Sequence, residues 1–487
     1  MNKYIYPFHS LISIMKMKNK KNIGKKFVKK NKPVGKPQPK KAEEGGGDKG
    51  KNKYNVLRGM HDILPKEERY WKACYHAAEK LSEYHQFGRI EMPILEEANL
   101  FIRSIGRGTD VVDKEMYLFE DRDGSKVCLR PEATASVVRA YNSHGMWNLP
   151  QPTKLWYWGA MFRHDRPQAG RYREFFQVGF ETMGSIDPAL DAELILLAYN
   201  FYQDIGLPVE IHVNSIGNLE DREKYKIELV NYYRSKRAYL CEDCKARISR
   251  NPMRLLDCKE AGCQPIKEEA PQIINWLGPE AKSHFMKVLE YLDELEIPYV
   301  LKPFLVRGLD YYNNTVFEVY PAPGGVDTAA NDEKAQSALG GGGRYDSLVE
   351  IMGGRSTQAV GMALGIDRTI TAWKQYNEVN KLIVSAPTYD VYFAQLGEEA
   401  KRVSLRLIND LRKSGVKLAY NFCRNSLKSQ LETANSLKVP LVIILGQKEV
   451  QDKTVIIRDM ESGVQEVADQ KKIEPLIKKK LETLALK

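Results

Sequence analysis

Phe162-Arg-His-Asp-Arg-Pro-Gln-Ala-Gly-Arg-Tyr-Arg-Glu-Phe-Phe-Gln-Val-Gly-Phe-Glu181 is the most informative segment of the sequence. It joins two strand-like runs, 154–162 and 173–182, through a loop rich in Arg, Gly and Pro. Because side chains alternate between the two faces of a strand, Gln177 and Glu181 share one face. The segment therefore predicts a hairpin that carries a carboxamide and a carboxylate on one side.

Four arginines lie in or beside this loop, namely Arg163, Arg166, Arg171 and Arg173. Guanidinium groups form bidentate hydrogen bonds with phosphate oxygens, so the loop is suited to a phosphorylated ligand. The alternative is an exposed basic hairpin without a ligand, and the number of arginines alone favours that alternative.

Strand-like and helical patterns continue on both sides of the hairpin. Short strand-like runs dominate residues 115–213, with helical stretches between them, and this mixture predicts a largely antiparallel sheet flanked by helices. Residues 219–302 are charged and helix-prone, which indicates a helical insertion. From 385 onward strands and helices alternate, as in a separate α/β domain. The strands expected in the first part are 116–119, 126–129, 154–162, 173–182, 209–213, 299–307 and 316–320, and the helices are 66–87, 133–144 and 188–205.

The positive charge of the chain is concentrated in its first 53 residues. Residues 1–53 contain sixteen Lys, no Arg and three acidic residues, a net charge of +13, whereas the whole chain carries +11 and residues 54–487 therefore carry −2. This Lys-rich segment has too little apolar surface to fold, so we expect a disordered tail. It could raise affinity for nucleic acid or act only as a solubilising extension.

Five further motifs occur in order along the chain: Arg89-Ile-Glu-Met-Pro93, Leu129-Arg-Pro-Glu-Ala-Thr-Ala-Ser136, Leu305-Val-Arg-Gly-Leu-Asp-Tyr-Tyr312, Gly340-Gly-Gly-Gly-Arg-Tyr-Asp346 and Gly361-Met-Ala-Leu-Gly-Ile-Asp-Arg368. Together with the hairpin they resemble the motifs of a class II aminoacyl-tRNA synthetase, and their amino-acid sequences are similar to those of the histidyl-tRNA synthetase family. The resemblance runs from about residue 54 to 487. It implies a tail (1–53), an α+β catalytic core (54–384) with an antiparallel sheet flanked by helices, a helical insertion within it (219–302), and an anticodon-binding α/β domain (385–487).

The resemblance implies a role for each residue that would bind histidine. Glu132 and Thr134, assisted by Gln177, would hold the α-ammonium group, and Glu181 and Tyr312 would hold the two nitrogens of the imidazole ring. A site that hydrogen-bonds a polar substrate in this way rejects analogues that lack the group.

The resemblance also implies how ATP is bound. Arg163 and Arg307 would be the catalytic residues. Arg163 would contact the α-phosphate and the histidine carboxylate, and Arg307 would lie opposite and do the work that a metal ion does in related synthetases. Arg171 and Arg368 would bind the outer phosphates. Mg²⁺ would arrive with ATP rather than in a protein cage.

The glycine run Gly340–Gly343 is not a P-loop, because no Gly-Lys-Ser/Thr follows it. Close approach of the backbone to the bound histidine and adenine is the expected reason for the glycines. Tyr311 and Tyr345 would close the same pocket.

Cys241, Cys244, Cys258 and Cys263 have a spacing close to that of a structural zinc site. Two arguments oppose zinc: the family does not depend on a metal for catalysis, and helix packing alone can fold an insertion. The sequence therefore favours the metal-free interpretation. The seven cysteines are an odd number, which disfavours a disulfide framework.

The implied function is ATP-dependent ligation of L-histidine to its cognate tRNA through a histidyl-adenylate, by a homodimer with Pro93 near the dimer interface. The alternative is a non-catalytic regulatory paralogue that acts in the ATP phosphoribosyltransferase complex of histidine biosynthesis. That paralogue lacks the anticodon-binding domain, whose counterpart here begins near 385. No run approaches the roughly 18 apolar residues of a membrane helix, and a signal peptide fits the first residues poorly. An organellar transit peptide is the alternative, but the absence of Arg from residues 1–53 weighs against it. We therefore expect a cytoplasmic protein without a membrane partner.

Overall fold

The computed structural model describes residues 54–106, 108–166, 170–322, 338–382, 384 and 389–485. The predicted tail, 1–53, lies outside the described residues. Within the described part of the chain, no helix is long and apolar enough to cross a membrane.

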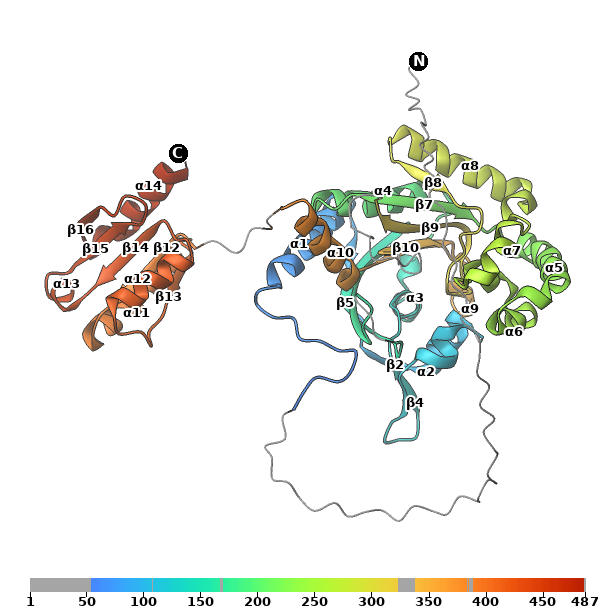
Figure 1. The fold of residues 1–487 in the computed structure, drawn as a ribbon, viewed down its shortest axis with the longest axis horizontal. Helices are drawn as coiled ribbons and strands as arrows, with labels where there is room; N and C mark the ends of the chain where they lie inside the picture. The colour runs from blue at the N-terminus through green and yellow to red at the C-terminus, as the bar shows by residue number, and fades with distance from the viewer. Residues whose placement is uncertain are drawn as a thin grey trace, which may run out of the picture. The chain divides into compact units, whose positions relative to one another are not determined.

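A sheet of eight strands forms the centre of the first part of the chain, in the order β1-β5-β6-β11-β10-β9-β7-β8 (Figure 1). The six inner strands are antiparallel to their neighbours, and only the edge strands β1 and β8 pair in parallel with β5 and β7. The predicted, largely antiparallel sheet is thus confirmed. Its strands are β1 (Gly88–Arg89), β5 (Thr153–Phe162), β6 (Glu174–Met183), β7 (Val209–Ser215), β8 (Tyr299–Leu301), β9 (Asn313–Pro321), β10 (Gly340–Arg344) and β11 (Ala359–Gly365).

The two faces of this sheet have different environments. One face packs on the apolar sides of α1 (Glu68–Tyr84), α4 (Ala189–Asp204) and α10 (Ile366–Val379), where Val178 and Phe180 of β6 are fully buried. The other face contacts α3 (Thr134–Ser143) and a second cluster of buried residues, among them Tyr311, Tyr312 and Tyr345. The alternation predicted for β6 is therefore observed, and it directs Gln177 and Glu181 toward the second face.

A smaller sheet precedes the hairpin in sequence. Strands β2 (Leu95–Glu97), β4 (Lys126–Leu129) and β3 (Leu118–Glu120) pair in antiparallel fashion in that order. The small sheet packs beside α2 (Ala98–Ile105), whose Phe101 and Ile105 share a buried cluster with Cys128 of β4. The loop that leaves β4 leads directly into α3 and carries Glu132.

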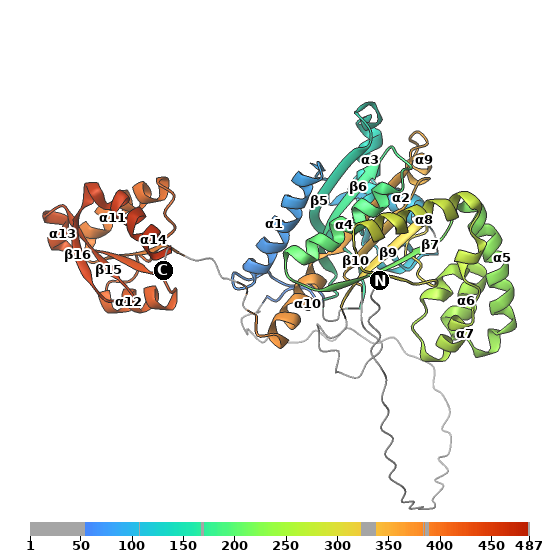
Figure 2. The ribbon, with the colours of Figure 1, turned by 90° about the horizontal axis from the view of Figure 1, so that it is seen from above.

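Residues 219–302 contain α5 (Leu219–Ser235), α6 (Glu242–Arg250), α7 (Gln264–Glu268) and α8 (Pro279–Glu294). The helices α5, α6 and α7 gather beyond one end of the main sheet (Figures 1 and 2). By contrast, Val288 and Leu292 of α8 belong to the buried cluster on the face of the main sheet that α1, α4 and α10 cover. Strand β8 pairs with β7. The strand-like run 299–307 is therefore a strand only as far as Leu301, and its remainder forms the loop that carries Arg307.

The last part of the chain has a five-stranded sheet in the order β13-β12-β14-β15-β16, parallel in its first three strands and antiparallel in the rest. Figure 2 shows α11 and α12 on opposite sides of this sheet, and each side buries its own cluster. The α/β prediction is confirmed. The elements are β12 (Val391–Gln395), α11 (Glu398–Lys413), β13 (Leu418–Tyr420), α12 (Leu427–Ser436), β14 (Leu441–Leu445), α13 (Gln447–Gln451), β15 (Thr454–Asp459), β16 (Gln465–Asp469) and α14 (Ile473–Ala485).

Candidate active site

Glu181 lies at the centre of the polar face of the main sheet and is fully buried. Its Oε1 accepts a hydrogen bond from Thr134 Oγ1 at 2.7 Å, and its Oε2 accepts one from Tyr345 Oη at 2.5 Å. Burial raises the pKa of this carboxyl to about 8, although the two hydrogen bonds lower it in part. Each carboxylate oxygen has two lone pairs, so both oxygens keep one for a ligand.

Glu132 occupies the loop before α3 and is almost fully buried. Its Oε2 accepts the backbone N–H of Thr134 at 2.7 Å and its Oε1 accepts that of Ala135 at 2.9 Å. These contacts satisfy free N–H groups at the start of the helix, which the cap residue Ala133 cannot do. Burial raises the pKa of Glu132, whereas its two N–H contacts and the nearby positive charge of Arg163 lower it in part.

Three tyrosines surround these two carboxyl groups. The ring centroids of Tyr311 and Tyr312 are 4.7 Å apart, and those of Tyr311 and Tyr345 are 5.8 Å apart. All three are buried, and burial raises the pKa of each phenol, so their hydroxyl groups stay protonated and can donate. The site thus offers a wall of aromatic rings with hydroxyl groups beside two acids.

Several buried polar atoms in this region have no hydrogen-bond partner among the described residues. They include Gln177 Oε1, Tyr157 Oη and Arg307 Nε. Buried polar groups in folded proteins are nearly always paired, so unpaired atoms lining a polar site are suited to a ligand. Tyr157, on β5, was not predicted from the sequence, since nothing in its local pattern separates it from an ordinary core tyrosine.

Arg163, Arg171 and Arg368 bring three positive charges to the start of α10. Arg163 Nε donates to the carbonyl of Pro131 at 2.8 Å, Arg171 Nε lies 2.5 Å from Asp165 Oδ2, and Arg368 Nη1 donates to the carbonyl of Ala338 at 2.9 Å. Burial, together with the charges of Arg171 and Arg163, lowers the pKa of Arg368 to about 10. The first turn of a helix adds positive potential, so this corner of the site is suited to an anion.

Arg307 approaches the same face from the loop after β8. Its Nη1 donates to Glu318 Oε1 at 2.6 Å, and its guanidinium group lies 5.5 Å from the centre of the Tyr312 ring. Tyr320 Oη donates to the other oxygen of Glu318 at 2.6 Å, which fixes that carboxylate. Glu318 was not predicted from the sequence, although an acidic residue on the polar face of a strand beside an arginine motif was a usable signal.

The glycines of the sheet create the space for these side chains. A Cβ atom on Gly341 would lie 2.8 Å from Arg307 Nη1, and one on Gly361 would overlap Glu181 Oε2. A Cβ on Gly342 would overlap the backbone of β11. Close approach between strands and to site residues therefore explains the glycine run.

The predicted histidine-binding acids and tyrosines thus lie on the polar face of the main sheet, and Arg171 and Arg368 lie near Arg163 at the start of α10. The charge of Arg163 acts on Glu132, and the charges of Arg307 and Glu181 both act on Tyr312. The four predicted cysteines lie elsewhere, in the insertion, where they also gather in one place.

Known proteins resemble this chain in sequence along most of its length. Residues 59–369 match the family model of histidyl-tRNA synthetase, and residues 390–480 match that of an anticodon binding domain. A histidine–tRNA ligase of Natranaerobius thermophilus is 43% identical over 424 residues, which cover 86% of this chain and 98% of that relative. The histidine–tRNA ligase of Bacillus subtilis is 41% identical over 417 residues, covering 85% of this chain and 95% of that relative.

Solved structures show the same likeness. The crystal structure of apo histidyl-tRNA synthetase from S. aureus is matched with a TM-score of 0.71 at 32% identity, over 88% of this chain and all of that one. The similarity in sequence and fold covers most of this chain and most of each of these relatives. The two family models match the two parts of the chain in order. The chain belongs to the histidyl-tRNA synthetase family.

Proposed function

We propose that this chain joins L-histidine to tRNA in two steps. In the first step the histidine carboxylate attacks the α-phosphorus of ATP, an O–P bond forms, and diphosphate leaves. In the second step a ribose hydroxyl at the 3′ end of the tRNA attacks the carbonyl carbon of the adenylate, and AMP leaves. The relatives that cover most of this chain are histidine–tRNA ligases, which favours this function over the regulatory paralogue.

The buried acids and tyrosines recognise histidine. Glu181 accepts a hydrogen bond from one imidazole nitrogen, and Tyr312 donates to the other, because the two ring nitrogens of neutral imidazole differ in this way. Glu132, Thr134 and Gln177 surround the α-ammonium group, and the unpaired Gln177 Oε1 is an acceptor that a cation satisfies. Tyr311 closes the pocket with its ring.

The arginines bind ATP and stabilise the transition state. Negative charge grows on the phosphate oxygens as the carboxylate attacks, and fixed cations in a buried site stabilise that charge. Arg163 and Arg307 act at the α-phosphate, and Arg171 and Arg368 hold the outer phosphates, with which Mg²⁺ enters. No side chain need act as a base, because the attacking carboxylate is already ionised.

The observation that carries this proposal is the cluster of buried acids and tyrosines beside an arginine group that includes Arg163 and Arg368. Histidine-dependent exchange of pyrophosphate into ATP tests it. We expect exchange with histidine and none without it. Arg307→Gln should lower the exchange rate by about 10²-fold or more, while the control Arg402→Gln, in which the side chain is 76% exposed, should not. Folded protein without histidine-dependent exchange would overturn the proposal.

We also infer that the chain works as a homodimer in the cytoplasm, with an anticodon-binding domain from about residue 385 and a core that ends near 384. The small sheet supports an interface, because Leu95 of β2 and Phe119 of β3 project from the same face of this sheet and expose 43% and 46% of their surface. Exposed apolar groups in one patch are typical of contact with a partner. Analytical ultracentrifugation tests the dimer, and we expect a particle with twice the chain mass of 55.7 kDa.

A further inference from the structure

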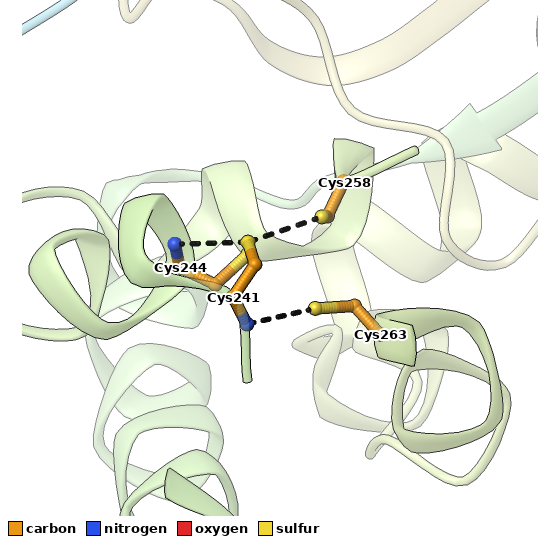
Figure 3. A group of neighbouring side chains, drawn as sticks. All are labelled: Cys241, Cys244, Cys258 and Cys263. Atoms are coloured by element: carbon orange, nitrogen blue, oxygen red, sulfur yellow. Dashed lines mark hydrogen bonds between the residues drawn. The ribbon is translucent and has the colours of Figure 1, made fainter. Parts of the chain in front are cut away.

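Four cysteines of the insertion converge on one point. The Sγ atoms of Cys241, Cys244, Cys258 and Cys263 all lie within 4.8 Å of one another. Figure 3 shows the four side chains directed toward a common centre from three separate turns of the backbone. Cys244, Cys258 and Cys263 are each at most 5% exposed, and Cys241 is partly exposed.

The backbone around the cluster is arranged to present sulfur atoms. Cys241 caps α6, and its Sγ accepts the backbone N–H of Cys244 at 3.4 Å. The backbone N–H of Cys241 in turn points at Cys263 Sγ at 3.3 Å. Gln264 Nε2 donates to the carbonyl of Cys258 at 2.7 Å and so fixes the turn between the last two cysteines. N–H groups directed at sulfur stabilise thiolates more than neutral thiols.

A disulfide bond and simple apolar packing both fit the cluster poorly. Cys241 Sγ and Cys258 Sγ are 3.9 Å apart, far longer than the roughly 2.05 Å of a disulfide bond. Apolar packing accounts for Cys74 and Cys128, which are fully buried in separate clusters. It does not account for four sulfurs that meet at one centre.

The distances suit a metal ion instead. Zinc binds thiolate at about 2.3 Å in a tetrahedron, which places neighbouring sulfurs roughly 3.8 Å apart. The 3.9 Å separation of Cys241 and Cys258 matches this value. We propose that Cys241, Cys244, Cys258 and Cys263 bind one Zn²⁺ ion as four thiolates, and that the site is structural because four protein ligands leave no open position. This reverses the metal-free interpretation that the sequence favours.

The segment that the proposed ion would hold in place contacts the loop between β8 and β9, which carries Arg307. Between Cys244 and Cys258, Arg247 Nη2 lies 3.2 Å from Asp110 Oδ2 and Asn251 Nδ2 donates to Asp310 Oδ1 at 3.0 Å. Asp310 belongs to this loop between β8 and β9, which also carries Arg307 and Tyr312. Loss of the ion should therefore loosen this loop as well as the insertion.

Metal analysis of the full-length chain, expressed with added zinc and purified without a metal-affinity step, tests the site. We expect about one zinc per chain, and release of that zinc as a thiol-specific reagent modifies the buried cysteines. Cys263→Ser should lower the zinc content at least tenfold, whereas Cys423→Ser, which removes an exposed cysteine outside the cluster, should leave it unchanged.

A second measurement covers the case in which Cys263→Ser does not fold. Cobalt exchanged into the unmodified protein should give the absorption bands of a tetrahedral thiolate site, which need no variant. Unmodified protein that contains less than about 0.1 zinc per chain and takes up neither zinc nor cobalt would overturn the proposal, as would a disulfide within the cluster. These measurements need no histidine or ATP, so their failure is distinct from failure of the proposed function.

Discussion

Glu181 is a fully buried acid, and both of its oxygens accept hydrogen bonds from hydroxyl groups. Removal from water favours the neutral acid, and this raises the pKa to about 8. At pH 7 the carboxyl group of Glu181 is therefore mostly protonated. Under the proposed function, Glu181 binds the imidazole N–H as a carboxylate, which is the stronger acceptor, so histidine binding is coupled to loss of this proton.

This linkage predicts that histidine binds more tightly as pH rises. Binding that requires loss of one proton strengthens up to the pKa of the group and then levels off, so affinity should increase roughly tenfold between pH 7 and 8.5. Calorimetric titration with histidine at several pH values measures this slope. Glu181→Gln should weaken binding and remove the slope, whereas the exposed Glu220→Gln should retain both affinity and slope. A Glu181→Gln protein with an unchanged slope would contradict the assignment.

Side-chain positions can be predicted from the sequence where the information is local. The alternation of β6 placed Gln177 and Glu181 on one face, and the fold bears this out. The fully buried ion pair between Arg344 and Asp191, in which Arg344 Nη2 lies 2.6 Å from Asp191 Oδ2, was not predicted. These residues are 153 positions apart, and only the folded chain brings the arginine to its acceptor.

At the scale of elements, the position of Glu181 depends on its neighbour strand. Gly361 of β11 is paired directly with Glu181 of β6. The absence of a side chain at Gly361 leaves the volume that the carboxylate fills, because a Cβ there would overlap Oε2 and lie 3.1 Å from the Tyr345 ring. The glycine at this position therefore shapes the proposed histidine pocket, and its backbone dihedral angles do not require it.

Gly361→Ala should accordingly impair histidine use specifically. Displacing Glu181 by about 1 Å can cost on the order of 10²-fold in kcat/KM for histidine, while the KM for ATP should change less than about twofold. Steady-state pyrophosphate exchange with each substrate varied in turn measures both values. The matched control is Gly88→Ala on β1 of the same sheet, where a Cβ meets nothing closer than 3.7 Å. Equal losses for both substrates would point to general damage to the sheet.

Elements with a strong periodic pattern were predicted closely. The runs 154–162 and 173–182 correspond to β5 (Thr153–Phe162) and β6 (Glu174–Met183), and the helical stretch 188–205 corresponds to α4. The run 299–307 was too long, because pairing with β7 ends at Leu301 and Lys302 N–H makes the last contact to Val213 O. Where a strand stops depends on its partner, which a single sequence does not reveal.

At the scale of the whole molecule, the chain has separate hydrophobic cores. Among the described residues, the two clusters on either side of the main sheet draw on residues up to Val384, and the two clusters of the last part begin at Val391. No residue is shared between these two sets. The alternation of strand and helix patterns after 385 predicted a separate domain, whereas convergence of the four cysteines required the folded insertion.

Separate cores predict that the two parts can be separated functionally. A chain ending at residue 384 retains every residue assigned to histidine and ATP, so its rate of histidine-dependent pyrophosphate exchange should stay within about threefold of the full chain. Transfer of histidine to tRNA should fall by 10²-fold or more, since the lost domain provides the proposed anticodon contacts. Parallel exchange and charging assays on both chains measure the ratio of the two losses. Equal loss of exchange and charging on truncation would show that the last part supports the catalytic core rather than the tRNA.

In the full-length chain, the double variant Arg424→Gln/Lys428→Gln removes two exposed cations without removing the domain. It should weaken charging but leave pyrophosphate exchange unchanged, because exposed Arg and Lys side chains contact tRNA phosphates.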